Sequence, residues 1–308
     1  MTTTTPATGS LNRDALGALT RATGFAIACG LAVLAVGLPV GLGLFLFARG
    51  ILGDDLREIG LHMEDSILFL HAAAMLLYLI AVLVFCWVAL RLFERGARVR
   101  DLGLTWRAGN GRLLAAASLA SGLLVLAALG IARWSGALTV EGTAVAVEGW
   151  GDLFLDLVGN MLLLLGLVLA EELAFRGYIR TTLSRALSPR AAVLIAATLY
   201  AVYRTALGAP SLLGAVNTLL AGLILGALAL SSGTLWVPIA ARLVWVFIQG
   251  AVFSLPVGGE VMEGVFVTHL APGPWLGGAA GVEASLLWWV ALSAGLGLTW
   301  ATLRTRLR

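Results

Sequence analysis

Long apolar runs separated by short polar segments dominate the chain. A helix needs roughly 20 apolar residues to cross a bilayer, and about eight runs approach or exceed that length. They lie at about residues 23–48, 67–92, 113–133, 152–174, 191–207, 212–230, 234–254 and 284–303. The fifth run is short and is followed by Gly208 and Pro210. This pattern predicts an all-α fold, a polytopic transmembrane helix bundle with about eight spans.

The composition excludes an ordinary soluble protein. Hydrophobic residues make up 60% of the 308-residue chain and charged residues only 12%, against about 25% charged in soluble domains. Cys29 and Cys86 both fall in apolar runs and have no metal-binding spacing. We therefore expect no disulfide framework, metal site or cofactor, and we expect membrane lipids as the surroundings of the protein.

The placement of the arginines predicts the orientation of the bundle. All 20 basic residues are arginines, and the net charge is +3. Thirteen of them gather before the first predicted span, after the second, after the fourth and after the last: Arg13 and Arg21; Arg95, Arg98, Arg100, Arg107 and Arg112; Arg180, Arg185 and Arg190; and Arg304, Arg306 and Arg308. Loops rich in Lys or Arg face the cytoplasm. We therefore expect both termini in the cytoplasm and the protein in a bacterial-type plasma (inner) membrane. Arginines beside spans give no indication of nucleic-acid binding.

A few ionisable residues lie inside the predicted spans, where each charge costs ~2.5–3.5 kcal/mol on insertion scales. Glu171 and Glu172 end the fourth span, and Arg204 and Arg242 lie in the fifth and seventh. Arg176 follows Glu172 by four residues, so the two side chains can pair on one helix face. Glu171 then needs a partner from another helix. The charges alone are consistent with a balanced ion-paired bundle, and Tyr200, close to Arg204, can hydrogen-bond within it.

The run Glu171–Gly177, with the sequence EELAFRG, resembles the E-E-x-x-x-R signature of the CPBP family. This family contains type II CAAX prenyl endopeptidases and Abi-like bacteriocin-processing proteins. Similar family sequence follows at 226–238, 253–259 and 281–287, so the resemblance covers roughly residues 150–300. It implies a CPBP-like transmembrane domain at 151–303. The polar, Thr-rich start of the chain predicts a disordered cytoplasmic tail at 1–22, the apolar runs predict accessory transmembrane helices at 23–150, and the arginines after the last span predict a cytoplasmic tail at 304–308.

The resemblance also implies catalytic roles. Family members are intramembrane endopeptidases in which a glutamate of the first motif, here Glu171 with Glu172, activates water. A second motif, F-x-x-x-H, supplies an assisting histidine, and a third, H-x-x-x-N, stabilises the oxyanion. Such groups act as a general base and as fixed hydrogen-bond donors to the developing charge.

Here the second and third motifs depart from the family pattern. The second aligns with residues 200–204, so Arg204 stands where histidine is expected. The third aligns with residues 242–246, so Arg242 replaces histidine and Val246 replaces asparagine. Arginine stays protonated and cannot act as a general base. Loss of a single oxyanion donor can cost about 10²–10³ in rate, so activity as an enzyme is uncertain.

Three functions remain open. The first is a catalytically degenerate CPBP-like protein that acts as a membrane binding or scaffold subunit. The second is an active, glutamate-dependent endopeptidase in which arginine polarises the scissile carbonyl, with a peptide substrate. The third is a binder or transporter of an anionic lipid or small molecule. His62, His71 and His269 lie outside the two altered motifs, and we interpret them as interfacial or loop residues.

Overall fold

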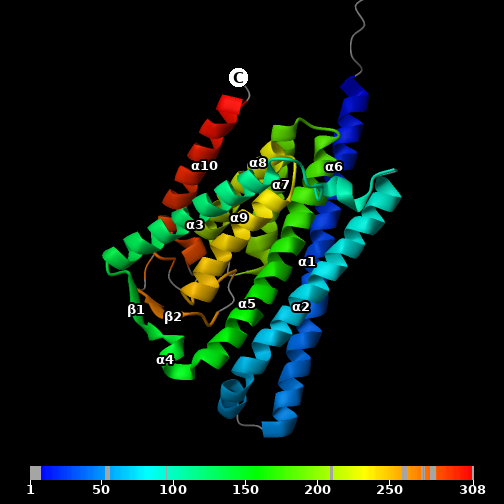
Figure 1. The fold of residues 1–308 in the computed structure, drawn as a ribbon. Coiled ribbons are helices and arrows are strands. Elements are labelled where there is room, and N and C mark those ends of the chain that lie inside the picture. Colours follow the sequence, from blue (N-terminus) through cyan, green and yellow to red (C-terminus); the bar gives the residue numbers. More distant parts are fainter. Residues whose placement is uncertain are drawn as a thin grey trace, which may run out of the picture.

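The computed structural model describes residues 8–52, 56–94, 96–208, 211–258, 262–271, 273, 275–277 and 282–306. In this part of the chain, helices form one bundle, and two short strands lie against it (Figure 1). The protein is an all-α membrane bundle, as the apolar runs predict.

The helices and strands follow one another as α1 (Thr8–Leu52), α2 (Leu56–Phe93), the 3₁₀ helix η1 (Val99–Leu102), α3 (Asn110–Trp134), β1 (Leu138–Thr143), α4 (Ala144–Glu148), α5 (Trp150–Glu171), the π-helix η2 (Glu172–Ile179), α6 (Arg180–Ser184), α7 (Pro189–Leu207), α8 (Leu212–Ser232), α9 (Trp236–Phe247), the π-helix η3 (Ile248–Val252), β2 (Phe266–Leu270), the 3₁₀ helix η5 (Val282–Ala284) and α10 (Leu286–Arg306).

Each predicted span coincides with a helix. Within the described residues, six helical segments are long and apolar enough to cross a membrane: Arg13–Val40, Leu68–Phe93, Asn110–Trp134, Trp150–Ser184, Pro189–Leu207 and Leu212–Ser232. The last two predicted spans correspond to shorter apolar helices, Trp236–Val252 and Leu286–Thr299. Gly233, in the left-handed region at φ 66°, ends α8 and lets the chain turn towards α9.

The helices pack mainly as pairs. α1 packs against α2, α2 against α5, α7 against α8, α3 against α9, and α8 against α10. The described chain begins and ends at the same end of the bundle, and the chain from α2 to α3 and helix α6 lie at that end too (Figure 1). The arginine-rich segments that the sequence predicts on one side are therefore at one end of the molecule.

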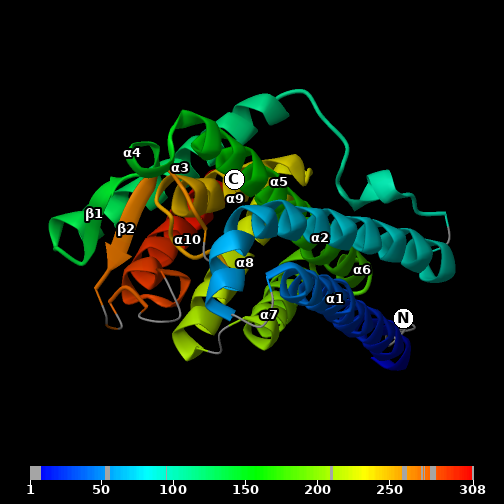
Figure 2. The same cartoon turned by 90° about the horizontal axis from the view of Figure 1, so that it is seen from below.

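Two features differ from the sequence prediction. Helix α1 begins at Thr8, so residues 8–22 are helical, and the prediction of a disordered tail there is corrected; residues 1–7 lie outside the described part. The side chains of Ala18 and Ala22 are buried, which explains why this polar segment is ordered. The strands β1 and β2, which the helical periodicity does not predict, pair antiparallel (Figure 2). They lie at the end of the bundle opposite the termini (Figure 1).

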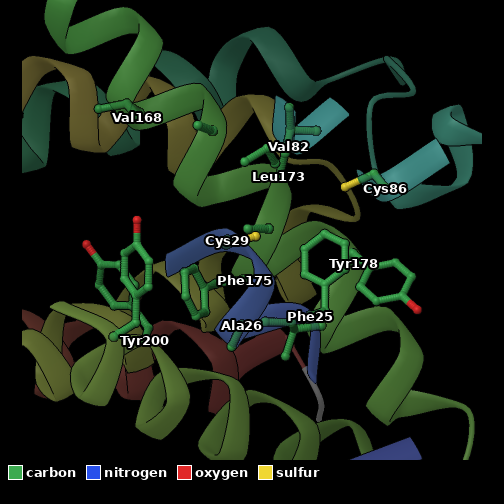
Figure 3. Close-up of a cluster of buried hydrophobic side chains, with 14 of the residues drawn as sticks. Phe25, Ala26, Cys29, Val82, Cys86, Val168, Leu173, Phe175, Tyr178 and Tyr200 are labelled. Atoms are coloured by element: carbon green, nitrogen blue, oxygen red, sulfur yellow. The ribbon is translucent and has the colours of Figure 1, made fainter. Parts of the chain in front are cut away.

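The core joins the accessory helices to the segment that carries the first motif. Phe25 of α1 lies over Tyr178 of η2, with ring centroids 4.3 Å apart. Cys29 of α1 and Cys86 of α2 are buried free thiols in the same cluster (Figure 3). In a lipid environment close van der Waals packing, rather than the hydrophobic effect, drives helix association. These contacts therefore hold η2 in place from the side of α1 and α2.

Candidate functional site: a buried ion-pair cluster

The first motif lies where the α-helix α5 changes into the π-helix η2. Glu171 is the last residue of α5, and Glu172 is the first of η2. Both side chains are buried, with exposed fractions of 1% and 0%. Short π-helical segments are rare and occur frequently at functional sites. Here the segment turns both carboxylates into the centre of the bundle.

Glu171 is held by three side chains from two other helices. Arg242 of α9 pairs with Oε2 through its Nη2. Tyr200 of α7 donates its hydroxyl hydrogen to the same oxygen at 3.0 Å. Arg204, one turn further along α7, donates from Nη1 to Oε1 at 3.4 Å. Both carboxylate oxygens of Glu171 are therefore engaged.

Glu172 binds two arginines through one oxygen. Arg176 Nη1 lies 3.1 Å from Oε1 and Arg242 Nη1 lies 3.3 Å from the same atom. The pairing of Glu172 with Arg176, predicted from their spacing, is thus present. Arg242 bridges the two glutamates with its two terminal nitrogens, the forked geometry for which guanidinium is suited.

Two of the guanidinium groups lie over the ring of Tyr200. The Cζ atom of Arg176 lies 4.2 Å from the ring centroid, and that of Arg242 lies 5.4 Å from it. Phe175 contacts the same ring edge-on, with centroids 5.1 Å apart. Cations over aromatic faces are attracted most strongly where water is excluded. Tyr200 therefore stabilises the cluster with both its hydroxyl group and its ring.

A third carboxylate, from near the C-terminal end of the chain, brings the carboxylates of the cluster to the same number as its guanidinium groups. Glu283 of η5 lies 3.6 Å from Arg204 Nη2 and accepts a hydrogen bond from the backbone N–H of Gly258 at 3.1 Å. Gly258 has φ 65° and packs against the Arg204 guanidinium, so a side chain there would collide with it. Three guanidinium groups thus face three carboxylates. The sequence signal for Glu283 was its place in the segment 281–287, which is similar to CPBP family sequence.

Two of the cavities that adjoin the cluster reach Glu171 or Arg242. One, of about 30 Å³, is lined by Arg204, Arg242, Val246, Asn217 and Trp288, among others. The other, of about 110 Å³, lies towards α2, and its lining includes His71, Tyr78, Glu171, Tyr203 and Arg204. Arg204 lines both, and it also lines a third cavity of about 50 Å³ beside Gly258 and Glu283.

Every residue assigned to the candidate site from the sequence is in or beside this cluster. The structure brings together Glu171, Glu172, Arg176, Tyr200, Arg204 and Arg242, and it places Val246 at the smaller cavity. Val246 offers no hydrogen-bond donor at the position where the family has asparagine. The catalytic roles of these residues stay predictions.

Sequence reasoning missed His71 and the tyrosine pair beside it. His71 lies in α2, in the first turn of the candidate span Leu68–Phe93, and lines the larger cavity together with Glu171, so it is not a loop residue. Its interfacial position stays a prediction. The Tyr78 and Tyr203 hydroxyl groups lie 2.9 Å apart. His269 is exposed on β2 near Glu141, and the side chain of His62 lies outside the described residues. The described residues contain no group of His, Cys, Asp and Glu side chains that could hold a metal ion.

Comparison with known protein families accounts for the region around the cluster. Residues 153–248 match the family model of type II CAAX prenyl endopeptidases, described as Rce1-like. We refer to this segment, residues 153–248, as the Rce1-like domain because of its similarity to that family. It includes both glutamates, Tyr200 and both substituted arginines, in agreement with the resemblance to the CPBP family. No curated protein and no solved structure matches the chain.

The match covers less than half of the chain. The Rce1-like domain contains α7, α8, α9 and nearly all of α5, and α1, α2 and α10 pack around it. His71, Tyr78 and Glu283 lie outside the matched segment and reach the ion-pair cluster or its cavities from these additional elements. The surroundings of the motif glutamates are thus built partly by residues that the family match does not include.

Proposed function

We propose that this integral membrane protein is a catalytically degenerate, Rce1-like protein that acts as a binding or scaffold subunit in the bilayer. The supporting observation is the engagement of both Glu171 oxygens by Arg242, Tyr200 and Arg204. A general base must accept a proton from water within hydrogen-bond reach. A carboxylate that already pairs with two guanidinium groups and a hydroxyl group is poorly suited to that step.

The substitutions in the second and third motifs support the same function. Each motif histidine is replaced by an arginine, and both arginines contact the motif glutamates. Buried carboxylates in a membrane are costly unless they are paired. The exchange therefore removes the assisting base and at the same time neutralises the charges that remain, which favours a structural role for the cluster.

The two other functions have less support. An active endopeptidase with arginine as the electrophile needs a guanidinium free to approach a carbonyl, but Arg242 already bridges both glutamates. A transporter or binder of anions at this site needs uncompensated positive charge. Instead, the three guanidinium groups of the cluster face the carboxylates of Glu171, Glu172 and Glu283.

The decisive experiment is a cleavage assay on the full chain. The purified protein is reconstituted in liposomes and supplied with a prenylated CAAX peptide, the substrate class that the family resemblance implies. We expect no turnover above that of Glu171→Gln in the same liposomes. Turnover by the wild type that is lost in a folded Glu171→Gln variant overturns the proposal in favour of an active endopeptidase.

We also propose that the arginine-rich end of the bundle faces the cytoplasm, with both termini on that side. The support is that the arginine-rich segments gather at one end (Figure 1), since such loops remain in the cytoplasm. A fluorescent protein fused after Arg308 should fluoresce, and alkaline phosphatase at the same position should be inactive. The reverse pair of results contradicts this orientation.

A further inference from the structure

A basic groove lies at the arginine-rich end of the bundle, outside the Rce1-like domain. It has a volume of about 490 Å³ and lies between the end of α2 and the beginning of η1. Its walls include Trp87, Leu90, Arg91, Ala97, Arg98 and Val99. Neither of the two arginines among the described residues of its lining, Arg91 and Arg98, takes part in the ion-pair cluster around Glu171.

The shape of the groove is fixed by a turn and by a buried carboxylate. After α2 the chain turns through Gly96, whose φ of 87° suits glycine, and the Ala97 N–H bonds to the Glu94 carbonyl at 3.0 Å. The Glu94 side chain is 5% exposed and pairs with Arg21 at 3.6 Å and with Arg185. The chain that carries Arg98 is thereby held beside the last turns of α2.

The acidic side chains near the groove are occupied elsewhere. The side chain of Glu94 is buried and pairs with Arg21 of α1 and with Arg185, which follows α6. Asp101 accepts the Arg98 backbone N–H at 2.8 Å and lies 3.7 Å from Arg100 Nε. No carboxylate is among the described residues that line the groove. The side chains of Arg91 and Arg98 thus present positive charge without an acidic neighbour in the lining.

The apolar surroundings place the groove at the edge of the membrane. α2 ends at Phe93, and the side chains of Trp87, Leu92 and Phe93 are more than half exposed on the outside of the bundle. Arg91 lies over the Trp87 ring, with its Cζ 5.5 Å from the ring centroid. Tryptophan is enriched at the level of the lipid headgroups. The groove is therefore at headgroup level, and acyl chains can pass along Leu92 and Phe93.

We propose that this groove binds the headgroup of an anionic phospholipid, with its phosphate between Arg91 and Arg98. Guanidinium groups bind phosphate oxygens in pairs and lose less hydration than ammonium groups do. The core arginines are neutralised by glutamates, whereas these two lie where a phosphate is within reach. The site would fix α2, which carries His71 and Tyr78, to one leaflet of the membrane.

The test compares lipid binding by the full-length protein and two variants. Native mass spectrometry in detergent measures the affinity for phosphatidylglycerol and for phosphatidylcholine with the same acyl chains. Each basic residue near an anionic surface contributes about 1 kcal/mol, or about fivefold in affinity. We expect Arg91→Gln with Arg98→Gln to weaken phosphatidylglycerol binding roughly 25-fold and to weaken phosphatidylcholine binding much less, because the choline cation offsets the charge of its phosphate.

The matched control is Arg112→Gln with Arg190→Gln. This variant loses the same charge at the beginnings of α3 and α7, away from the groove. It should bind phosphatidylglycerol within about twofold of the wild type, since exposed charges beyond a Debye length of about 8 Å are screened. Equal weakening in both double variants, or none in the groove variant, overturns the site.

A competition experiment identifies the source of the phosphate. Glycerol phosphate and inorganic phosphate are added to the complex with phosphatidylglycerol at 150 mM salt. We expect neither to displace the lipid at millimolar concentration, because neither contacts Leu92 and Phe93. Displacement at that concentration contradicts a lipid site and identifies a site for soluble phosphate. The groove variants leave Glu171 and the ion-pair cluster unchanged, so this test is independent of the proposed function.

Discussion

Glu171 and Arg242 form a buried ion pair between α5 and α9, although 71 positions separate them in the sequence. The CPBP family, which this segment resembles, has a histidine where Arg242 stands in this chain. The pair therefore connects the first and third motifs directly. Its energetic importance can be measured apart from any activity.

Removing one partner of this pair should destabilise the protein strongly. In Arg242→Met, Glu171 and Glu172 lose their shared cation in a site with almost no exposure, and breaking a buried pair costs about 3–5 kcal/mol. Equilibrium unfolding in mixtures of detergent and sodium dodecyl sulfate measures this loss. Arg204→Met should cost less, because its contacts to Glu171 and Glu283 are longer and its side chain is 18% exposed.

The double variant Glu171→Gln with Arg242→Met supplies the control. It removes the carboxylate and its cation together, so it should be more stable than the sum of the single effects predicts. A coupling energy of at least about 1 kcal/mol is expected for residues in one ion-pair network. Additive effects would show that the contact contributes no stability.

Restoring the family motifs should recover peptidase chemistry. The variant with Arg204→His, Arg242→His and Val246→Asn places two possible bases and one hydrogen-bond donor around Glu171. Because a lost oxyanion donor alone costs about 10²–10³ in rate, we expect cleavage of a prenylated peptide only when all three changes are present. The same triple variant with Glu171→Gln should be inactive.

If the folded triple variant does not cleave the peptide, features other than these three positions account for the missing activity. The additional contacts of Glu283 and the cavity beside His71 are then the next features to change. Folding is checked by comparing the size-exclusion profile and the thermal unfolding of the triple variant with those of the wild type.

The hydrogen bond between Tyr78 and Tyr203 should stabilise the docking of α2 on the Rce1-like domain. Tyr78→Phe leaves the Tyr203 hydroxyl group without this partner and should cost about 1–3 kcal/mol. The double variant Tyr78→Phe with Tyr203→Phe should lose little more than one single variant. Detergent unfolding of the four proteins in this cycle measures the difference, and two independent, additive losses would contradict the shared bond.

Close contact between α2 and α5 should depend on Gly166. A Cβ atom built there would lie 3.0 Å from the backbone carbon of Met75 and 3.1 Å from its oxygen, so a helix must shift. Gly166→Ala should therefore destabilise the bundle by about 1–3 kcal/mol. Gly130→Ala on α3 is the matched control, because nothing lies within 4 Å of the added methyl group. Equal stability of the two variants would contradict the tight contact.

Much of the fold is predictable from the sequence because the bilayer imposes one simple requirement. A spanning segment must satisfy its backbone hydrogen bonds internally, which leaves long apolar helices as the solution. The runs at 113–133 and 212–230 therefore anticipate α3 and α8 closely. The hydropathy pattern did not predict the helix at residues 8–22, because this helix depends on small side chains that pack against other helices.

The candidate site, like the fold, is predictable from the sequence only in part. The cost of unpaired charge in the membrane requires partners for Glu171 and Glu172, and the sequence contains few candidates for that role, chiefly Arg176, Arg204 and Arg242. Spacing alone predicted the pair Glu172–Arg176. Which guanidinium group bridges the two glutamates depends on how α9 packs against α5, and no local pattern contains that information.

The sequence by itself determined that this protein lies in the membrane. It also predicted that the arginine-rich segments share one side and that arginines stand where the resembled family has its motif histidines. Only the tertiary structure decided that Glu283, far along the chain, pairs with Arg204 and that His71 of α2 shares a cavity with Glu171. The physical reason is the distance along the chain over which each kind of signal acts. Hydropathy and helix spacing act over a few turns, whereas these contacts depend on the packing of helices that are distant in the sequence.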